Sequence, residues 1–185
     1  NDTAQNEREI RKNIFKNERV NFILGVILVI FSLYLTISFI SFFFTGSIDQ
    51  SKVENLSVGE LSSIGNEIQN WTGAFGAYLS NLMINRWMGI SAFIVSLWLY
   101  VVGRRFMKVA HTRMIRFTIS CALSIIVLSL FFGFIFMHSY NNTFLYLGGY
   151  HGYYATLWLN AWIGPWGTAL FIIACLLYTS PSPRD

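Results

Sequence analysis

Four long apolar runs constrain what this 185-residue chain can fold into more than any other feature of its sequence. They cover about 22–44, 87–103, 115–137 and 153–174, and the first holds no ionisable group apart from Tyr34. A run of about 18 or more apolar residues is long enough to cross a bilayer as an α-helix. Hydrophobic residues make up 54% of the chain and charged residues only 12%, so a water-soluble fold is not expected. The sequence predicts an all-α integral membrane protein with four transmembrane helices.

The first apolar run differs from a cleaved signal peptide, although a basic segment precedes it. Its apolar stretch is longer than the ~7–15 residues typical of such peptides, and no small-x-small cleavage site follows it. We therefore expect residues 1–21 to form a basic cytoplasmic segment and residues 22–174 to form one membrane domain.

Lysine and arginine set the expected orientation, because the cytoplasmic loops of membrane proteins are enriched in them. Two parts of the chain are basic, the N-terminal segment and the loop between the second and third runs: they contain Arg8, Arg11, Lys12, Lys16, Arg19, Arg104, Arg105, Lys108, Arg113 and Arg116. The loop Thr45–Asn70 has Lys52 alone, and His138–His151 has neither residue type. Both termini are predicted to face the cytoplasm. Binding of the basic clusters to nucleic acid or anionic lipid is the alternative interpretation.

A seventeen-residue pattern occurs twice, as "GAFGAYLSNLMINRWMG" at Gly73–Gly89 and as "GGYHGYYATLWLNAWIG" at Gly148–Gly164. An overlay without gaps makes six pairs identical, namely Gly73/Gly148, Tyr78/Tyr153, Leu82/Leu157, Asn85/Asn160, Trp87/Trp162 and Gly89/Gly164. Each copy follows an apolar run and a loop poor in Lys and Arg, so the repeated unit is a helical hairpin. The prediction is two parallel-repeat hairpins with both termini inside. Chance similarity between segments of biased composition is the alternative.

Nine residues of these two blocks are candidates for helix packing. Small residues three apart lie on nearly one face of a helix, where a neighbouring helix can approach closely. An asparagine within a span can hydrogen-bond to a neighbouring helix, and a proline is expected to kink the fourth span. The candidates are Gly73, Gly76, Asn85, Gly89, Gly149, Gly152, Asn160, Gly164 and Pro165.

No catalytic, cofactor-binding or metal-binding residue is predicted. The "GGYHG" stretch lacks the Gly-Lys-Ser/Thr ending of a phosphate-binding loop. Cys121 and Cys175 form no metal-binding spacing, and the three histidines are interpreted as residues of the membrane interface. Arg86 either extends toward the interface or marks an ion path, and its counterpart Ala161 argues against a chemical role shared by both copies.

The layout resembles the N-terminal membrane domain of the FtsK/SpoIIIE family of bacterial DNA translocases. The resemblance rests on the basic N-terminal segment, four spans, and two glycine-rich returns, "GAFGAYLSNLMINRWMGISAFIVSLWL" and "GGYHGYYATLWLNAWIGPWGTALFII". It covers nearly all of Asn21–Ala174, and Asn85–Arg86 is more polar than is usual for the family.

The resemblance implies a membrane-anchoring and assembly domain of a septal DNA translocase, acting in cell division and chromosome segregation. It further implies the bacterial inner membrane, a homo-oligomer, and division-site membrane proteins as partners. ATP, Mg²⁺ and DNA would bind only a motor C-terminal to the membrane domain, so the chain itself is not expected to be an enzyme. A small multi-span transporter or channel is the alternative. A membrane-embedded enzyme has less support, because no catalytic arrangement lies within a span.

The last eleven residues, "CLLYTSPSPRD" from Cys175 to Asp185, match the translation of a widely used transposase adapter. We therefore expect the native sequence to stop near Ala174 and the motor to be missing from this fragment. A Ser/Pro-rich linker that leaves the membrane is the alternative.

Overall fold

The computed structural model describes residues 18–54, 56–109, 112–138 and 144–179, and within them all regular structure is helical. Expectations about residues 1–17, His111 and 180–185 lie outside these ranges. Four helical stretches of the described chain are long and apolar enough to cross a membrane: Glu18–Val53, Gly73–Phe106, Met114–Ile135 and Gly149–Thr179. The predicted all-α fold with four membrane helices is confirmed. The membrane orientation stays a prediction.

Helix α2 (Glu18–Val53) is longer than the apolar run that predicts it. Its 36 residues correspond to about 54 Å at 1.5 Å per residue, against a hydrocarbon core of about 30 Å. Most of the extra length lies in the polar stretch Thr45–Val53, where Thr45, Asp49 and Val53 are buried by neighbouring segments. These contacts stabilise a helical extension beyond the end of the apolar run.

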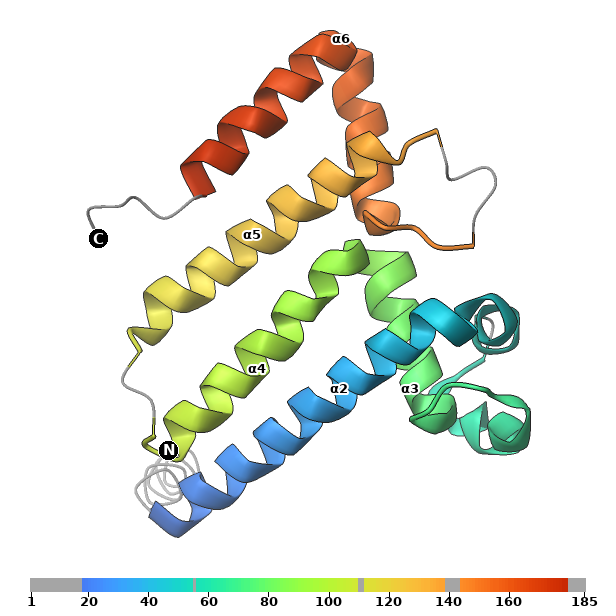
Figure 1. The fold of residues 1–185 in the computed structure, drawn as a ribbon, viewed down its shortest axis with the longest axis vertical. Coiled ribbons are helices and arrows are strands. Elements are labelled where there is room, and N and C mark those ends of the chain that lie inside the picture. Colours follow the sequence, from blue (N-terminus) through green and yellow to red (C-terminus); the bar gives the residue numbers. More distant parts are fainter. Residues whose placement is uncertain (1–17, 55, 110–111, 139–143, 180–185) are drawn as a thin grey trace, which may run out of the picture.

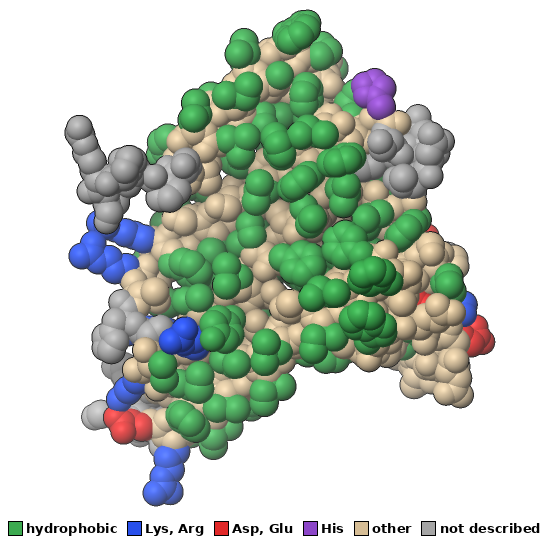
Figure 2. Space-filling view, in the orientation of Figure 1, with side chains coloured by type: hydrophobic (Ala, Val, Ile, Leu, Met, Phe, Trp, Pro, Cys, Tyr) green, Lys and Arg blue, Asp and Glu red, His purple; other side chains and the backbone are tan. Residues whose placement is uncertain are grey.

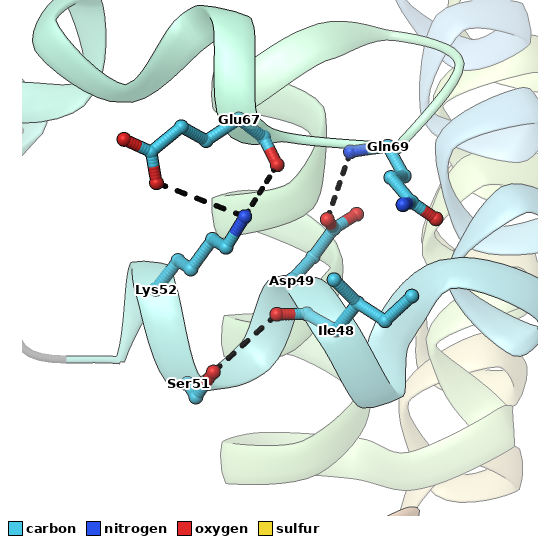
Figure 3. Close-up of polar contacts among 6 residues, drawn as sticks. All are labelled: Ile48, Asp49, Ser51, Lys52, Glu67 and Gln69. Carbon is cyan, nitrogen blue, oxygen red and sulfur yellow. Dashed lines mark hydrogen bonds and ion pairs between the residues drawn. The ribbon is translucent and has the colours of Figure 1, made fainter.

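The segment after α2 folds back over this extension. Its main element is the 3₁₀ helix η1 (Val58–Glu67), and Leu61 packs with Val53 and Ala77 in a small core. Figure 3 shows the polar contacts: Lys52 Nζ donates to the Glu67 carbonyl oxygen at 2.6 Å, and the Gln69 amide donates to Asp49 Oδ1 at 2.8 Å. Residues 56–69 therefore pack against α2 and α3.

The second span is a series of helical pieces. It consists of α3 (Gly73–Ser80), the π-helix η2 (Asn81–Met88), a short 3₁₀ turn η3 (Gly89–Ser91) and α4 (Ala92–Phe106). Helices α3 and α4 run in different directions, and both contact α2 (Figure 1).

The third and fourth spans repeat this arrangement. Helix α5 (Met114–Ile135) packs against α6 (Gly149–Thr179), which bends at Gly164 (Figure 1). The residues Cys175–Thr179 of the expected adapter tail continue α6.

The interior of the first pair of spans is apolar, and its hydroxyl groups are hydrogen-bonded. Leu35, Phe39, Phe42, Ile84 and Ala92 form the largest buried cluster. Nearby serines pair across helices: Ser32 donates to the Ser96 carbonyl oxygen at 2.6 Å, and the Ser38 and Ser80 hydroxyls lie 2.7 Å apart. Such pairing removes the cost of burying a polar group in an apolar interior.

The outer surface is covered by hydrophobic side chains over most of the face in Figure 2. Most described Lys and Arg side chains gather at one end of the helices, where α4 ends and α5 begins, and include Arg104, Arg105, Lys108, Arg113 and Arg116, whereas Lys52 and Arg86 lie near the C-terminal end of α2. The acidic residues Glu60 and Glu67 belong to η1 at the opposite end. Charged side chains thus lie toward the two ends of the helices, as a bundle needs if its middle is in lipid and its ends are in water.

Candidate functional site at the junction of the two halves

Both halves of the molecule contain the same pair of backbone features. Gly73 and Gly149 begin the return helices with φ values of 76° and 68°, and each amide donates at 2.8 Å to the carbonyl oxygen three residues earlier, in Asn70 and Tyr146. Gly89 and Gly164 then interrupt the helices at φ 66°, ψ −147° and φ 71°, ψ 167°. These values lie close to a region that is essentially restricted to glycine. The return segments therefore share their start and their break.

The backbone corrects the register of the repeat. The overlay without gaps pairs Gly73 with Gly148, whereas the shared conformation pairs Gly73 with Gly149. The first copy is one residue longer between its start and its break, and η2 accommodates the extra residue because a π-helical turn is wider than an α-helical one. From Asn85/Asn160 to Gly89/Gly164 the register of the overlay holds.

The bend of α6 lies where a kink at Pro165 was expected, but its position is set by Gly164. Gly89 interrupts the chain in the same conformation and is followed by Ile90 rather than proline. The residues after the two glycines differ in hydrogen bonding. The Ile90 amide donates to the Leu147 carbonyl oxygen at 2.8 Å, whereas Pro165 has no amide hydrogen to donate. The glycine therefore creates the break in both copies.

The two halves meet where the break of the first contacts the start of α6, a contact between Asn85–Ile90 and Phe144–Gly149 that we name the junction. A Cβ atom at Gly89 would lie 1.9 Å from the Leu147 carbonyl oxygen, and one at Gly149 would lie 2.4 Å from the Trp87 carbonyl oxygen. Both distances are too short for a side chain. The junction is a direct contact of backbone with backbone that only glycine allows.

Asn85 links three segments at the junction, and only 1% of its surface is exposed. Its Nδ2 lies 3.1 Å from the Phe144 carbonyl oxygen and 3.2 Å from Gln50 Oε1, and its Oδ1 accepts from the Tyr146 amide at 3.1 Å. Each such hydrogen bond in a membrane contributes roughly 0.6 to 2 kcal/mol. Asn85 therefore joins α2, η2 and the segment before α6.

Asn160, the counterpart of Asn85, has a different environment. Its Nδ2 lies 3.5 Å from Met137 Sδ, and its Oδ1 is buried with no hydrogen-bond partner in the part of the chain that the structure describes. A Cβ atom built on Gly164 or on Gly73 would meet no atom within 4 Å in the described structure. The break of the second half and the start of the first half are thus both open, whereas their counterparts are packed against each other.

Gly76 and Gly152 face a serine of the preceding span. Ser38 Oγ donates to the Gly76 carbonyl oxygen at 2.7 Å, and Ser129 Oγ donates to the Gly148 carbonyl oxygen at 2.6 Å. A Cβ atom at Gly152 would lie 2.1 Å from the Ser129 carbonyl oxygen. In both halves the glycine-rich start of the return helix lies against a serine of the outgoing helix.

The sequence did not identify three close-packed glycines, which are Gly25, Gly103 and Gly133. A Cβ atom at Gly25 would lie 2.6 Å from the Gly103 carbonyl oxygen, which places α2 against α4, and one at Gly133 would lie 2.5 Å from the carbonyl oxygen of Gly152. Each is an isolated glycine inside an apolar helical pattern, a signal of close packing that carries no information about the partner.

Arg86 lies beside the end of α2, where it donates to the carbonyl oxygen of Glu54. Together with Trp87, Tyr150 and Tyr154 it lines an open cavity. Among the described residues no cluster of three His, Cys, Asp or Glu side chains could hold a metal ion.

A comparison with protein families identifies residues 17–180 as a match to the 4TM region of DNA translocase FtsK/SpoIIIE. No curated protein and no solved structure matched the chain significantly.

Proposed function

Because this chain belongs to the FtsK/SpoIIIE family as its four-helix membrane region, we propose that it anchors a DNA translocase in the bacterial cytoplasmic membrane at the division septum. The match over residues 17–180 is the observation that carries the proposal, since it includes every described helix. The module assembles with further copies and with division-site membrane proteins, and it serves cell division and chromosome segregation.

The distribution of charge supports the proposed orientation, with both termini inside. The ends of α4 and α5 that carry Arg104, Arg105 and Arg116 lie at the same end of the molecule as the start of α2 (Figure 1). Lys108 is also at this end and forms an ion pair with Glu18. By the positive-inside rule this end faces the cytoplasm, where a motor following α6 would meet DNA.

ATP, Mg²⁺ and DNA enter the proposal only through that motor, which would follow the membrane region. The membrane region contributes position and assembly, and we assign none of its residues to nucleotide or DNA.

The test is localisation in dividing cells. The chain, fused at its C-terminus to a fluorescent protein, is expected to concentrate at the septum, while an unrelated four-span protein with the same fusion spreads along the membrane. A uniform membrane signal from the fusion would contradict the septal role. Flux of solutes across reconstituted vesicles that is lost in Arg86→Ala would instead favour a transporter or channel.

A further inference from the structure

We propose that the open break of the second half, Asn160–Pro165, binds the open start of the first half, Gln69–Gly73, of a second copy of this chain. The inference rests on the assembly role proposed above and adds the surfaces, the partner and the direction of assembly.

The junction supplies the pattern for this contact. Inside one molecule, the break at Gly89 receives the start of the following return helix at Gly149, and the two backbones touch. The counterparts of these surfaces are the break at Gly164 and the start at Gly73. They have the same backbone conformation, and neither has a neighbour within 4 Å of its Cβ position in the described structure. Each molecule therefore has one open break and one open start. These are the two kinds of surface that form the junction inside one molecule.

The hydrogen-bonding groups on the two open surfaces are complementary. At the junction the Tyr146 amide donates to Asn85 Oδ1 at 3.1 Å. Asn70 occupies the position of Tyr146, because its carbonyl oxygen accepts from Gly73 as that of Tyr146 accepts from Gly149. The Asn70 amide has no acceptor among the described residues, and Asn160 Oδ1 is buried without a donor. Because its own chain covers this oxygen, the Asn160 side chain has to turn outward before a second copy can bring this donor and this acceptor together.

Large apolar side chains surround both open surfaces. Trp71 is 65% exposed beside Gly73, and Trp162 is 75% exposed beside Gly164. Aromatic residues are enriched in the buried centres of protein interfaces. Lipid alone around these side chains is the competing outcome, because tryptophan is also common at membrane surfaces.

Pro165 makes the contact between copies different from the junction in one respect. Pro165 occupies the position of Ile90, whose amide donates to the Leu147 carbonyl oxygen at the junction. Trp71 is the counterpart of Leu147, and its carbonyl oxygen receives no such hydrogen bond because proline has no amide hydrogen. Asn160 and the tryptophans then carry the contact, and we expect it to be weaker than the junction.

The contact is head-to-tail, because it joins two different surfaces. Such contacts build a ring when the rotation between copies closes and a filament when it does not. In Figure 1 the second half lies beside the first, and its helices run in the same directions as their counterparts. Helix α5 lies next to α4, and the bend of α6 lies far from α3. A second copy added by this rule keeps the same orientation in the membrane.

Cysteine cross-linking between two tagged variants tests the proposal. Trp71→Cys and Trp162→Cys are placed on separate copies, each with Cys121→Ala and Cys175→Ala, and co-expressed in membranes. The mixed pair is expected to form a disulfide dimer on mild oxidation, while neither variant forms one with itself. The control pair Ile30→Cys and Leu170→Cys, which are 61% and 69% exposed on α2 and α6, should give only background.

Asn160→Ala, added to the Trp162→Cys copy, gives the second readout. We expect it to lower the mixed cross-link by about threefold to thirtyfold, the effect of losing one membrane hydrogen bond. It should leave the monomer fold intact, because among the described residues Asn160 Oδ1 has no partner and its Nδ2 makes only the long 3.5 Å contact to Met137 Sδ.

The possible outcomes separate this inference from the septal role. A mixed cross-link no stronger than the control, or self-linked Trp162→Cys dimers, overturns head-to-tail assembly even if the fluorescent fusion still reaches the septum. A mixed cross-link that weakens with Asn160→Ala supports it, even if the fusion fails to localise.

Discussion

Gly89 and Gly164 have the same backbone conformation in different surroundings. The carbonyl of Leu147 packs directly on Gly89, whereas the Cβ position of Gly164 faces open space in the described structure. Any side chain at either site meets conformational strain of roughly 1–3 kcal/mol. At Gly89 alone it also displaces the start of α6 from the junction.

This difference predicts unequal effects of one substitution. Gly164→Ala should lower the free energy of unfolding by about 1–3 kcal/mol, the cost of the strained conformation. Gly89→Ala should cost clearly more, because the new methyl group would lie 1.9 Å from the Leu147 carbonyl oxygen. Unfolding in mixed micelles, monitored by circular dichroism, measures both variants. Equal losses would show that the junction contributes nothing to stability.

At the level of helical elements, the number of spans follows from apolar runs alone, but the second helical stretch begins at Gly73, fourteen residues before the expected span 87–103. The extension of α2 through Val53 could not be predicted from apolar runs, because Thr45–Val53 is polar. Its helical structure depends on burial of Asp49 and Val53 by later segments. The repeat pattern identified Asn85 and Gly89 as candidates. Their partners in the Phe144–Gly149 segment could not be predicted, because pairing between distant segments depends on the relative placement of the two halves.

The bend of α6 should survive the loss of Pro165. Gly89 produces the same break with Ile90 after it, so Pro165→Ala is expected to keep the bend, whereas Gly164→Ala with Pro165→Ala is expected to reduce it. Spin labels at Tyr154→Cys and Leu170→Cys report the distance across the bend. A straight helix would separate their backbones by about 24 Å at 1.5 Å per residue, and a shorter separation indicates the bend. Straightening in Pro165→Ala alone would assign the bend to proline.

The start of η1 should be sensitive to acid. The Ser57 amide and hydroxyl both donate to Glu60 Oε2, at 2.8 and 2.7 Å, and these bonds lower the pKa of Glu60 from its ordinary 4.5. A lowered pKa in the folded state means that the stabilisation is complete above pH 4.5 and is lost as the pH falls through the folded value.

Hydrogen exchange of the Ser57 amide measures this effect. After correction for the intrinsic exchange rate, protection should stay constant above pH 4.5 and fall as the pH is lowered below that value. Glu60→Gln is the matched control, because its neutral amide oxygen still accepts but does not titrate in this range. The same pH dependence in the variant would assign the change to another group.

For the whole molecule, the charge pattern predicts which ends are accessible from each side of the membrane. Ser62 lies in η1 and Thr112 precedes α5, and both are exposed. In a background without Cys121 and Cys175, a membrane-impermeant maleimide added outside spheroplasts should label Ser62→Cys but label Thr112→Cys only after lysis. The reverse pattern would place the arginine-rich ends outside and contradict the proposed site of the motor.

The wide turn of η2 has a consequence for how chains of this kind can vary. The stretch from Gly73 to Gly89, which contains η2 (Asn81–Met88), holds one amino acid more than the stretch from Gly149 to Gly164, yet the glycines that bound the two stretches have matching conformations. Loss or gain of a single codon is therefore tolerated here without displacing the ends. When related genes are aligned, their one-residue gaps should gather between positions 74 and 88.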